Sequence, residues 1–167
     1  MESLARVSSA QSTDIAELAA VAAHTFPLAC PPSVAPEDVA SFIEANLSDS
    51  RFAEYLADPL RMVFTARRDD RIVGYAMLIR DDDGRIELSK MYVLPAQHGS
   101  GVATALMDAA LAAAADWGAE GVWLGVNQKN KRAQRFYAKS GFTVSGTRMF
   151  QLGAHTEHDY VMVRAVR

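Results

Sequence analysis

The spacing of apolar residues changes along the chain and divides it into a helical part and a β-rich part. Between Ile15 and Ala22 apolar residues recur every three or four positions, which predicts a helix that starts after Thr13 or Asp14. Pro27, Pro31 and Pro32 are expected to break it and to form a loop. Further helices are expected over residues 33–47 and 52–56. From residue 62 onward the apolar runs are short and β-rich, so this part is expected to form strands.

The predicted strands enclose two more helices. Apart from a short first strand at Arg6-Val7, strands are expected over residues 62–66, 72–79, 86–93, 122–126, 144–152 and 159–166. A long helix should open after Gly99-Ser100-Gly101 and end at Gly118, and another should cover residues 130–140. This order predicts an α/β protein with a mixed sheet, folded as a single domain over residues 1–167.

Composition and charge exclude several functional classes. Half of the 167 residues are hydrophobic, 22% are charged and the net charge is −3, so the chain has no basic footprint for nucleic acid. Cys30 is the one cysteine, which excludes an internal disulfide and a Cys-rich zinc site, and we expect no metal. The first eleven residues do not resemble a signal peptide, and no run approaches the ~18 apolar residues of a membrane span. A cytoplasmic protein without membrane partners is expected.

The glycine loop is the most informative segment. A strand ending in Met91-Tyr92-Val93 leads through Gly99-Ser100-Gly101 into a helix that opens with Val102-Ala103-Thr104. Glycines and the free N–H groups of a helix N-terminus together suit a bound pyrophosphate. The segment is not a P-loop, because no Gly-Lys-Ser/Thr follows, and Thr104 replaces the third glycine of a dinucleotide fingerprint. A tight turn with a glycine needed for packing is the alternative interpretation.

Two motifs in register resemble those of the GNAT superfamily of N-acetyltransferases. Tyr92-Val-Leu-Pro followed by His98-Gly-Ser-Gly-Val-Ala is similar to motif A, with His98 in place of the usual Gln or Arg. Asn130-Lys-Arg-Ala, Phe136-Tyr137 and Ser140-Gly-Phe resemble motif B. The chain is also similar to bacterial spermine/spermidine-type N-acetyltransferases.

The resemblance implies a fold and a cofactor. It implies the GNAT acyltransferase fold, a central, mostly antiparallel sheet with flanking helices, and binding of acetyl-CoA. The residues that it assigns to the cofactor are Met91, Tyr92, Val93, Gly99, Ser100, Gly101, Val102, Ala103, Thr104, Asn130 and Ala133.

A general acid and a donor to the acetyl oxygen follow from the same resemblance. Tyr137 is the candidate acid, since a phenol of pKa ~10 can protonate a thiolate of pKa ~8.5. A Tyr packed beside Phe136 is the structural alternative. The resemblance also places a bulge in the strand over residues 86–93, which would free a backbone N–H for the oxyanion.

The general base is less well defined. Many relatives carry an acidic residue where this chain has Gly125, and Glu87 is the remaining carboxylate near the expected site. Strict alternation places Glu87 on one face with Ser89 and Met91. A surface glutamate, or direct loss of the amine proton to water, are the alternatives. His158 and Asp159 are expected near the acceptor.

These features predict an enzyme that transfers an acetyl group from acetyl-CoA to a primary amine of a small molecule, polyamine-like or other. Transfer should be direct within a ternary complex, because Cys30 lies in a Pro-rich loop far from the motifs. A CoA-binding sensor or interaction module that has lost turnover is the rival, supported by Gly125. Family habit makes a homodimer possible.

Overall fold

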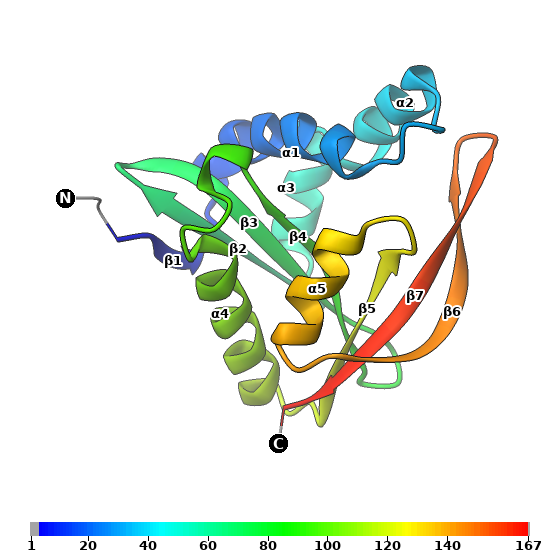
Figure 1. Ribbon diagram of the computed structural model, residues 1–167. Coiled ribbons are helices and arrows are strands. Elements are labelled where there is room, and N and C mark those ends of the chain that lie inside the picture. The colour runs from blue at the N-terminus through cyan, green and yellow to red at the C-terminus, as the bar shows by residue number, and fades with distance from the viewer. Residues whose placement is uncertain (1–3, 167) are drawn as a thin grey trace.

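The computed structural model describes residues 4–166, so residues 1–3 and 167 of the predicted domain lie outside the described part. Within that part seven strands form one twisted sheet in the order β1-β2-β3-β4-β5-β7-β6 (Figure 1). Along the chain they are β1 (Arg6–Ser9), β2 (Arg61–Arg68), β3 (Arg71–Arg80), β4 (Ile86–Val93), β5 (Gly121–Asn127), β6 (Thr143–Leu152) and β7 (His155–Ala165). All neighbouring strands are antiparallel except β4 and β5. The predicted mixed, mostly antiparallel sheet is confirmed.

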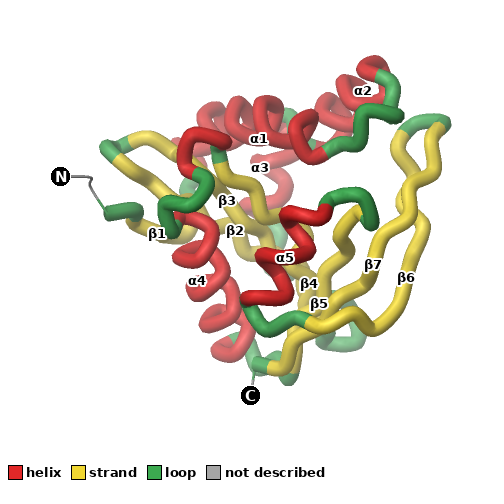
Figure 2. The backbone as a smooth tube through the Cα atoms, viewed as in Figure 1, coloured by secondary structure: helices red, strands yellow, loops and turns green. Residues whose placement is uncertain are grey.

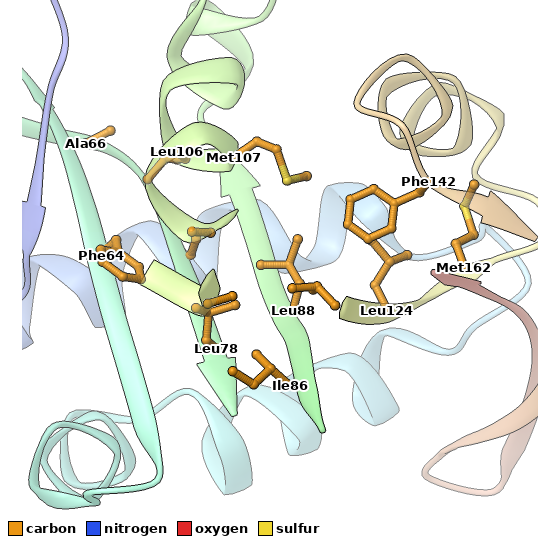
Figure 3. Packing of buried hydrophobic residues seen from close by; sticks show 14 of the residues in the cluster. Phe64, Ala66, Leu78, Ile86, Leu88, Leu106, Met107, Leu124, Phe142 and Met162 are labelled. Carbon is orange, nitrogen blue, oxygen red and sulfur yellow. The ribbon is translucent and has the colours of Figure 1, made fainter. Parts of the chain in front are cut away.

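Helices cover both faces of the sheet (Figures 1 and 2). On one face lie α1 (Ile15–Ala29), α2 (Pro36–Asn46) and α3 (Asp49–Ala57), and on the other α4 (Val102–Asp116) and α5 (Lys131–Lys139). Each face has its own hydrophobic cluster, because side chains alternate between the faces along every strand. In Figure 3, Leu106 and Met107 of α4 lie over Leu78 and Leu88, with Phe142, Leu124 and Met162 beside them.

The sheet is divided between β4 and β5. These two parallel strands pair at Ile86–Val122 and Glu87–Trp123, near the start of each, and no further pair is made within the described residues. Beyond this point the strands diverge (Figure 1). The second half of β4 therefore keeps free backbone groups on the side that faces β5.

A β-bulge at Ser89 changes the face on which β4 side chains lie. Leu78 of β3 pairs with Leu88, and Met77 pairs with Lys90, so Ser89 has no counterpart. The bulge expected in this strand is confirmed. The face predicted for Glu87 is right for Ser89, which lines the same cavity as Glu87, and wrong for Met91. Because the bulge adds one residue, Glu87 shares its face with Lys90 and Tyr92, whereas Met91 lies on the opposite face.

Helix α1 runs past Pro27 and ends at Ala29, before Pro31 and Pro32, so of the three prolines expected to break the helix, Pro27 does not do so. Proline in the last turn removes one N–H donor, and the helix still closes with Cys30 N donating to the carbonyl of Pro27. The extra residues bring Leu28 and Ala29 to the site described below. No helix in residues 4–166 has the length and apolar character required to cross a bilayer.

Candidate active site

A groove of about 710 Å³ opens where β4, the glycine loop and the first turns of α4 and α5 meet the end of α1. It collects most of the residues that the sequence assigned to a cofactor. Those lining it are Met91, Tyr92, Val93, Gly99, Gly101, Ala103, Thr104, Asn130 and Ala133, together with the candidate acid Tyr137. Segments that lie far apart in the sequence therefore form one continuous surface.

The glycine loop is open rather than tightly packed. Gly99 and Gly101 have φ values of +81° and +92°, and a Cβ on either would meet no atom of residues 4–166 within 4 Å apart from its chain neighbours. The glycines are thus required by the left-handed backbone and not by close packing, which argues against the packing interpretation. Gly101 is also the N-cap residue of α4 and provides no side-chain cap. The first N–H groups of α4 are consequently available to an anion in the groove.

Two of the predicted cofactor residues do not present their side chains to the groove. The hydroxyl of Ser100 donates to the carbonyl of Gln97 within the loop. Val102 is fully buried in the core beneath α4. Any contribution of Ser100 and Val102 to a ligand in the groove would be made by their backbone.

Helix α5 contributes one amide and one phenol to the groove. Asn130 Oδ1 accepts a hydrogen bond from the N–H of Ala133 at 3.1 Å, which caps the helix and leaves the amide NH₂ of Asn130 as a donor. The Tyr137 ring lies 5.6 Å from Phe136 and 6.0 Å from Phe142, measured between centroids. Burial raises the pKa of Tyr137 to about 12, so the phenol retains its proton at neutral pH.

Sequence reasoning missed one wall of the groove. Thr25, Leu28 and Ala29 of α1 line it, although nothing in their local sequence marks them as ligand contacts. Arg132, Phe136 and His98 also line it, and their positions within the two motifs were the available signal. His98 Nε2 lies 3.0 Å from the carbonyl oxygen of Val93, so its ring is held against the end of β4.

A second cavity of about 310 Å³ adjoins the groove, and Tyr92 and Ala29 line both. Its lining includes Glu87 and Asp159, two of the residues expected near the acceptor, but not His158. Cys30 also lines it, so the prediction that Cys30 lies far from the motifs is wrong. Burial and nearby Glu157 raise the pKa of the Cys30 thiol to about 11, which makes it a poor nucleophile at neutral pH.

The second cavity contains both acidic and basic side chains. Arg148 of β6 lies between Asp159, whose Oδ2 accepts from Nε at 3.2 Å, and Glu87, whose Oε2 is 3.9 Å from Nη1. Burial raises the pKa of both carboxyl groups, and in each case Arg148 opposes that rise. Burial lowers the pKa of nearby Lys90 to about 8.

Comparison with known proteins decides the family. Residues 25–142 match the acetyltransferase (GNAT) family. The chain belongs to the GNAT family. It is 72% identical over 152 residues to an uncharacterized N-acetyltransferase of Mycobacterium tuberculosis, covering 91% of this chain and 97% of that protein. An uncharacterized N-acetyltransferase of Lactobacillus delbrueckii subsp. lactis is 26% identical over 160 residues and is covered to 92%, as is this chain. The protein is therefore a GNAT N-acetyltransferase.

Solved structures confirm the GNAT fold. The PaiA N-acetyltransferase from Thermoplasma acidophilum, in complex with coenzyme A, has a TM-score of 0.86 at 19% identity and covers 98% of this chain and 99% of its own. The ribosomal-protein-S18-alanine N-acetyltransferase from Escherichia coli has a TM-score of 0.74 at 17% identity, covering 98% and 94%. At this level of identity the similarity concerns the fold.

The groove of this GNAT protein suits coenzyme A on its own chemistry. The uncapped N-terminus of α4 and the open glycine loop suit a pyrophosphate. Beside them, Ala133, Phe136 and Leu28 provide an apolar wall, and the Asn130 amide provides a donor for a carbonyl of the pantetheine arm.

Proposed function

We propose that this GNAT protein transfers an acetyl group from acetyl-CoA directly to a primary amine of a small molecule, polyamine-like or other, within one ternary complex. The observation that carries the proposal is the junction of two cavities at Tyr92 and Ala29. The groove with the candidate acid and the cavity with the candidate base meet there, so the two substrates can approach each other without a covalent enzyme intermediate.

Binding and orientation of acetyl-CoA are assigned to the groove. The cofactor would supply the acetyl group as a reactive thioester. The backbone from Gly99 to Thr104 would bind the pyrophosphate, while Asn130 and Ala133 would hold the pantetheine arm beside Met91, Tyr92 and Val93 of β4. A free N–H in the diverging half of β4, next to the Ser89 bulge, would donate to the acetyl oxygen.

Proton transfer is assigned to two side chains on opposite sides of the junction. The second cavity, which would bind the amine, is called the acceptor cavity below. Glu87, which lines it, would take the proton that the amine loses as it attacks. Tyr137, in the groove, would donate a proton to the departing sulfur. The raised pKa values of both groups support this assignment, because a more basic carboxylate accepts a proton better and a buried phenol keeps its own.

The charge of the acceptor cavity supports a cationic amine as the acceptor. Glu87, Glu157 and Asp159 line it against Lys90 and Arg148, and Lys90 has a lowered pKa. The absence of an acidic residue at Gly125 favoured a sensor without turnover. The Glu87 carboxylate of β4 lines the same cavity and could act as the base in its place. We therefore favour a working acetyltransferase over a sensor.

The test is transfer of the acetyl group from acetyl-CoA to a pooled set of amines that includes polyamines, amino acids and amino sugars. Release of free thiol should depend on the amine, and mass spectrometry should find the acetylated amine. A protein that binds CoA tightly but releases no thiol with any amine would contradict the proposal and favour the sensor.

A further inference from the structure

The Arg148 side chain connects carboxylates on strands that are not neighbours. Arg148 lies on the edge strand β6, directly opposite Asp159 of β7, to which it donates. Its guanidinium continues over β5, where it lies 5.5 Å from the centroid of the Trp123 ring, and reaches Glu87 on β4. One side chain thus spans four strands of the sheet and ends at the candidate base.

Gly125 makes this path possible. A Cβ at position 125 would lie 2.5 Å from Cζ and 2.6 Å from Nε of Arg148, distances that no real Cβ contact tolerates. Any side chain on β5 at this position would occupy the space that the guanidinium now fills. Gly125 stands where many relatives carry an acid, and its lack of a side chain leaves the space in which the Arg148 guanidinium reaches the cavity.

We propose that Arg148, admitted over β5 by Gly125, is a positioning residue that keeps Glu87 ionised and directed into the acceptor cavity. The proposal deepens the proposed function, since it rests on Glu87 as the base. Asp159 holds Nε in place, so that the outer end of the guanidinium can face Glu87.

The charges around Glu87 support this role. Glu87 faces Arg148 from β6, Lys90 from its own strand, Arg61 from β2 and Asp81 from the turn after β3. Trp123 of β5 is uncharged, and Asp159 of β7 is engaged by Arg148. Among the three cations, Arg148 has the largest effect on the pKa of Glu87 and lowers it, against the effect of burial. Lys90, with its own pKa lowered to about 8, cannot replace it fully at alkaline pH.

Four variants separate the effect of Arg148 from general damage. Arg148→Gln removes the charge, and Arg148→Lys keeps a charge without the planar fork. Gly125→Ala leaves Arg148 in the chain but displaces its guanidinium, which is the flexible end of a long side chain and can move without disturbing the fold. Gly146→Ala is the matched control, because it adds the same methyl group to β6 at a point where, chain neighbours aside, the described part of the chain places no atom within 4 Å.

Two measurements are made on each variant. The first is the dependence of kcat on pH with one amine throughout, so that the ionisation of the amine is the same in every profile. The second is an NMR titration of ¹³C-labelled glutamate carboxyl groups, in which the Glu87 signal is assigned by its loss in Glu87→Gln. The titration reports the pKa of Glu87 whether or not Glu87 takes part in catalysis.

Arg148→Gln and Gly125→Ala are each expected to raise the pKa of Glu87 by about one pH unit. The apparent pKa of the acidic limb of the kcat profile should rise by the same amount. Combining them should add little, because both remove the same contact. Arg148→Lys should leave the pKa of Glu87 close to its wild-type value, because a positive charge remains. Gly146→Ala should match the wild type.

An unchanged Glu87 pKa in Arg148→Gln would overturn the proposal, and so would a Gly125→Ala protein that behaves like the wild type. A raised Glu87 pKa with an unchanged kcat profile would support the link to Arg148 and would instead refute Glu87 as the base. Failure of the inference and failure of the proposed function are therefore distinguishable.

Discussion

At the scale of single residues, burial acts on the two candidate proton carriers in the same direction but with different consequences. It raises the pKa of Tyr137, which keeps the phenol protonated, and it raises the pKa of Glu87, which makes the carboxylate a stronger base. Arg148 limits the rise at Glu87, whereas the rise at Tyr137 is due to burial. Tyr137 thus keeps its proton at neutral pH, while Arg148 limits how far burial raises the pKa of Glu87.

Removal of the Tyr137 hydroxyl tests the acid. Tyr137→Phe keeps the ring between Phe136 and Phe142, so the melting temperature and the affinity for CoA should change little. Turnover should fall about 10²-fold, the lower end for general acid catalysis. Steady-state kinetics and a CoA titration of the purified variant measure both. Wild-type turnover in a variant that binds CoA normally would remove Tyr137 from the mechanism, and loss of the fold would favour a packing role.

Replacement of the Glu87 carboxylate tests the base through its pH dependence. A base works above its own pKa, and an amine of pKa ~10 needs no base once the solution is alkaline enough to deprotonate it. Glu87→Gln should therefore slow turnover most near neutral pH and approach the wild-type rate at high pH. The measurement is a pH profile of kcat for both proteins. An equal loss at every pH would indicate a structural role, and no loss would leave the amine proton to water.

Local patterns in the sequence located most of the candidate site but not the contacts across the sheet. The glycine loop and the Asn130 motif are contiguous signals, and both lie in the groove as expected. The path of Arg148 over Gly125 joins residues more than twenty positions apart, and its one sequence signal is a glycine in an otherwise apolar strand. A bulge in β4 was expected. Its exact position at Ser89, and therefore the face of the sheet on which Met91 lies, is known only from the register of β3 and β4.

At the scale of elements, periodicity predicted the type of each helix and strand and was least accurate at their ends. Strand β4 was predicted over its full length. The predicted end of α1 was too early, because proline usually breaks a helix and Pro27 does not do so here. Tertiary packing decides such cases. The last turn of α1 lies against the groove, and this contact between distant segments cannot be inferred from the helix itself.

The N-terminus of α4 offers a test of the phosphate site as an element. Gly101→Asp places a carboxylate and a strained left-handed residue at the helix start, where it would repel a pyrophosphate. CoA should raise the melting temperature of the wild type by mass action, and most of that shift should disappear in the variant. Thermal unfolding with and without CoA measures both.

Gly118→Asp is the matched control for this prediction. Gly118 has φ +91° and open space around its Cβ position, much as Gly101 has, but it lies beyond the opposite end of α4. It should lower the melting temperature of the free protein while keeping the shift that CoA produces. Equal CoA shifts in Gly101→Asp and wild type would exclude the proposed phosphate site.

At the scale of the whole molecule, the sheet consists of two parts joined by a short parallel contact. Helices α1, α3 and α4 pack on strands β1 to β4, whereas α2 also contacts β6, where the Phe42 and Phe150 ring centroids lie 5.8 Å apart. Between the parts β4 and β5 make two residue pairs, and the groove lies where they diverge. Its lining comes from α1, β4 and α4 on one side and from α5 on the other. A ligand in the groove would therefore contact both parts.

Hydrogen exchange tests whether CoA joins the two parts. If it does, saturating CoA should slow amide exchange in the last turn of α1, the second half of β4, the first turn of α4 and the first turn of α5 together. The β6–β7 turn and β1 lie outside the groove lining and should exchange as before. Gly101→Asp at the same CoA concentration should show no such protection. Protection confined to the first turn of α4 would mean that phosphate binding alone occurs and that α1 and α5 are not bridged.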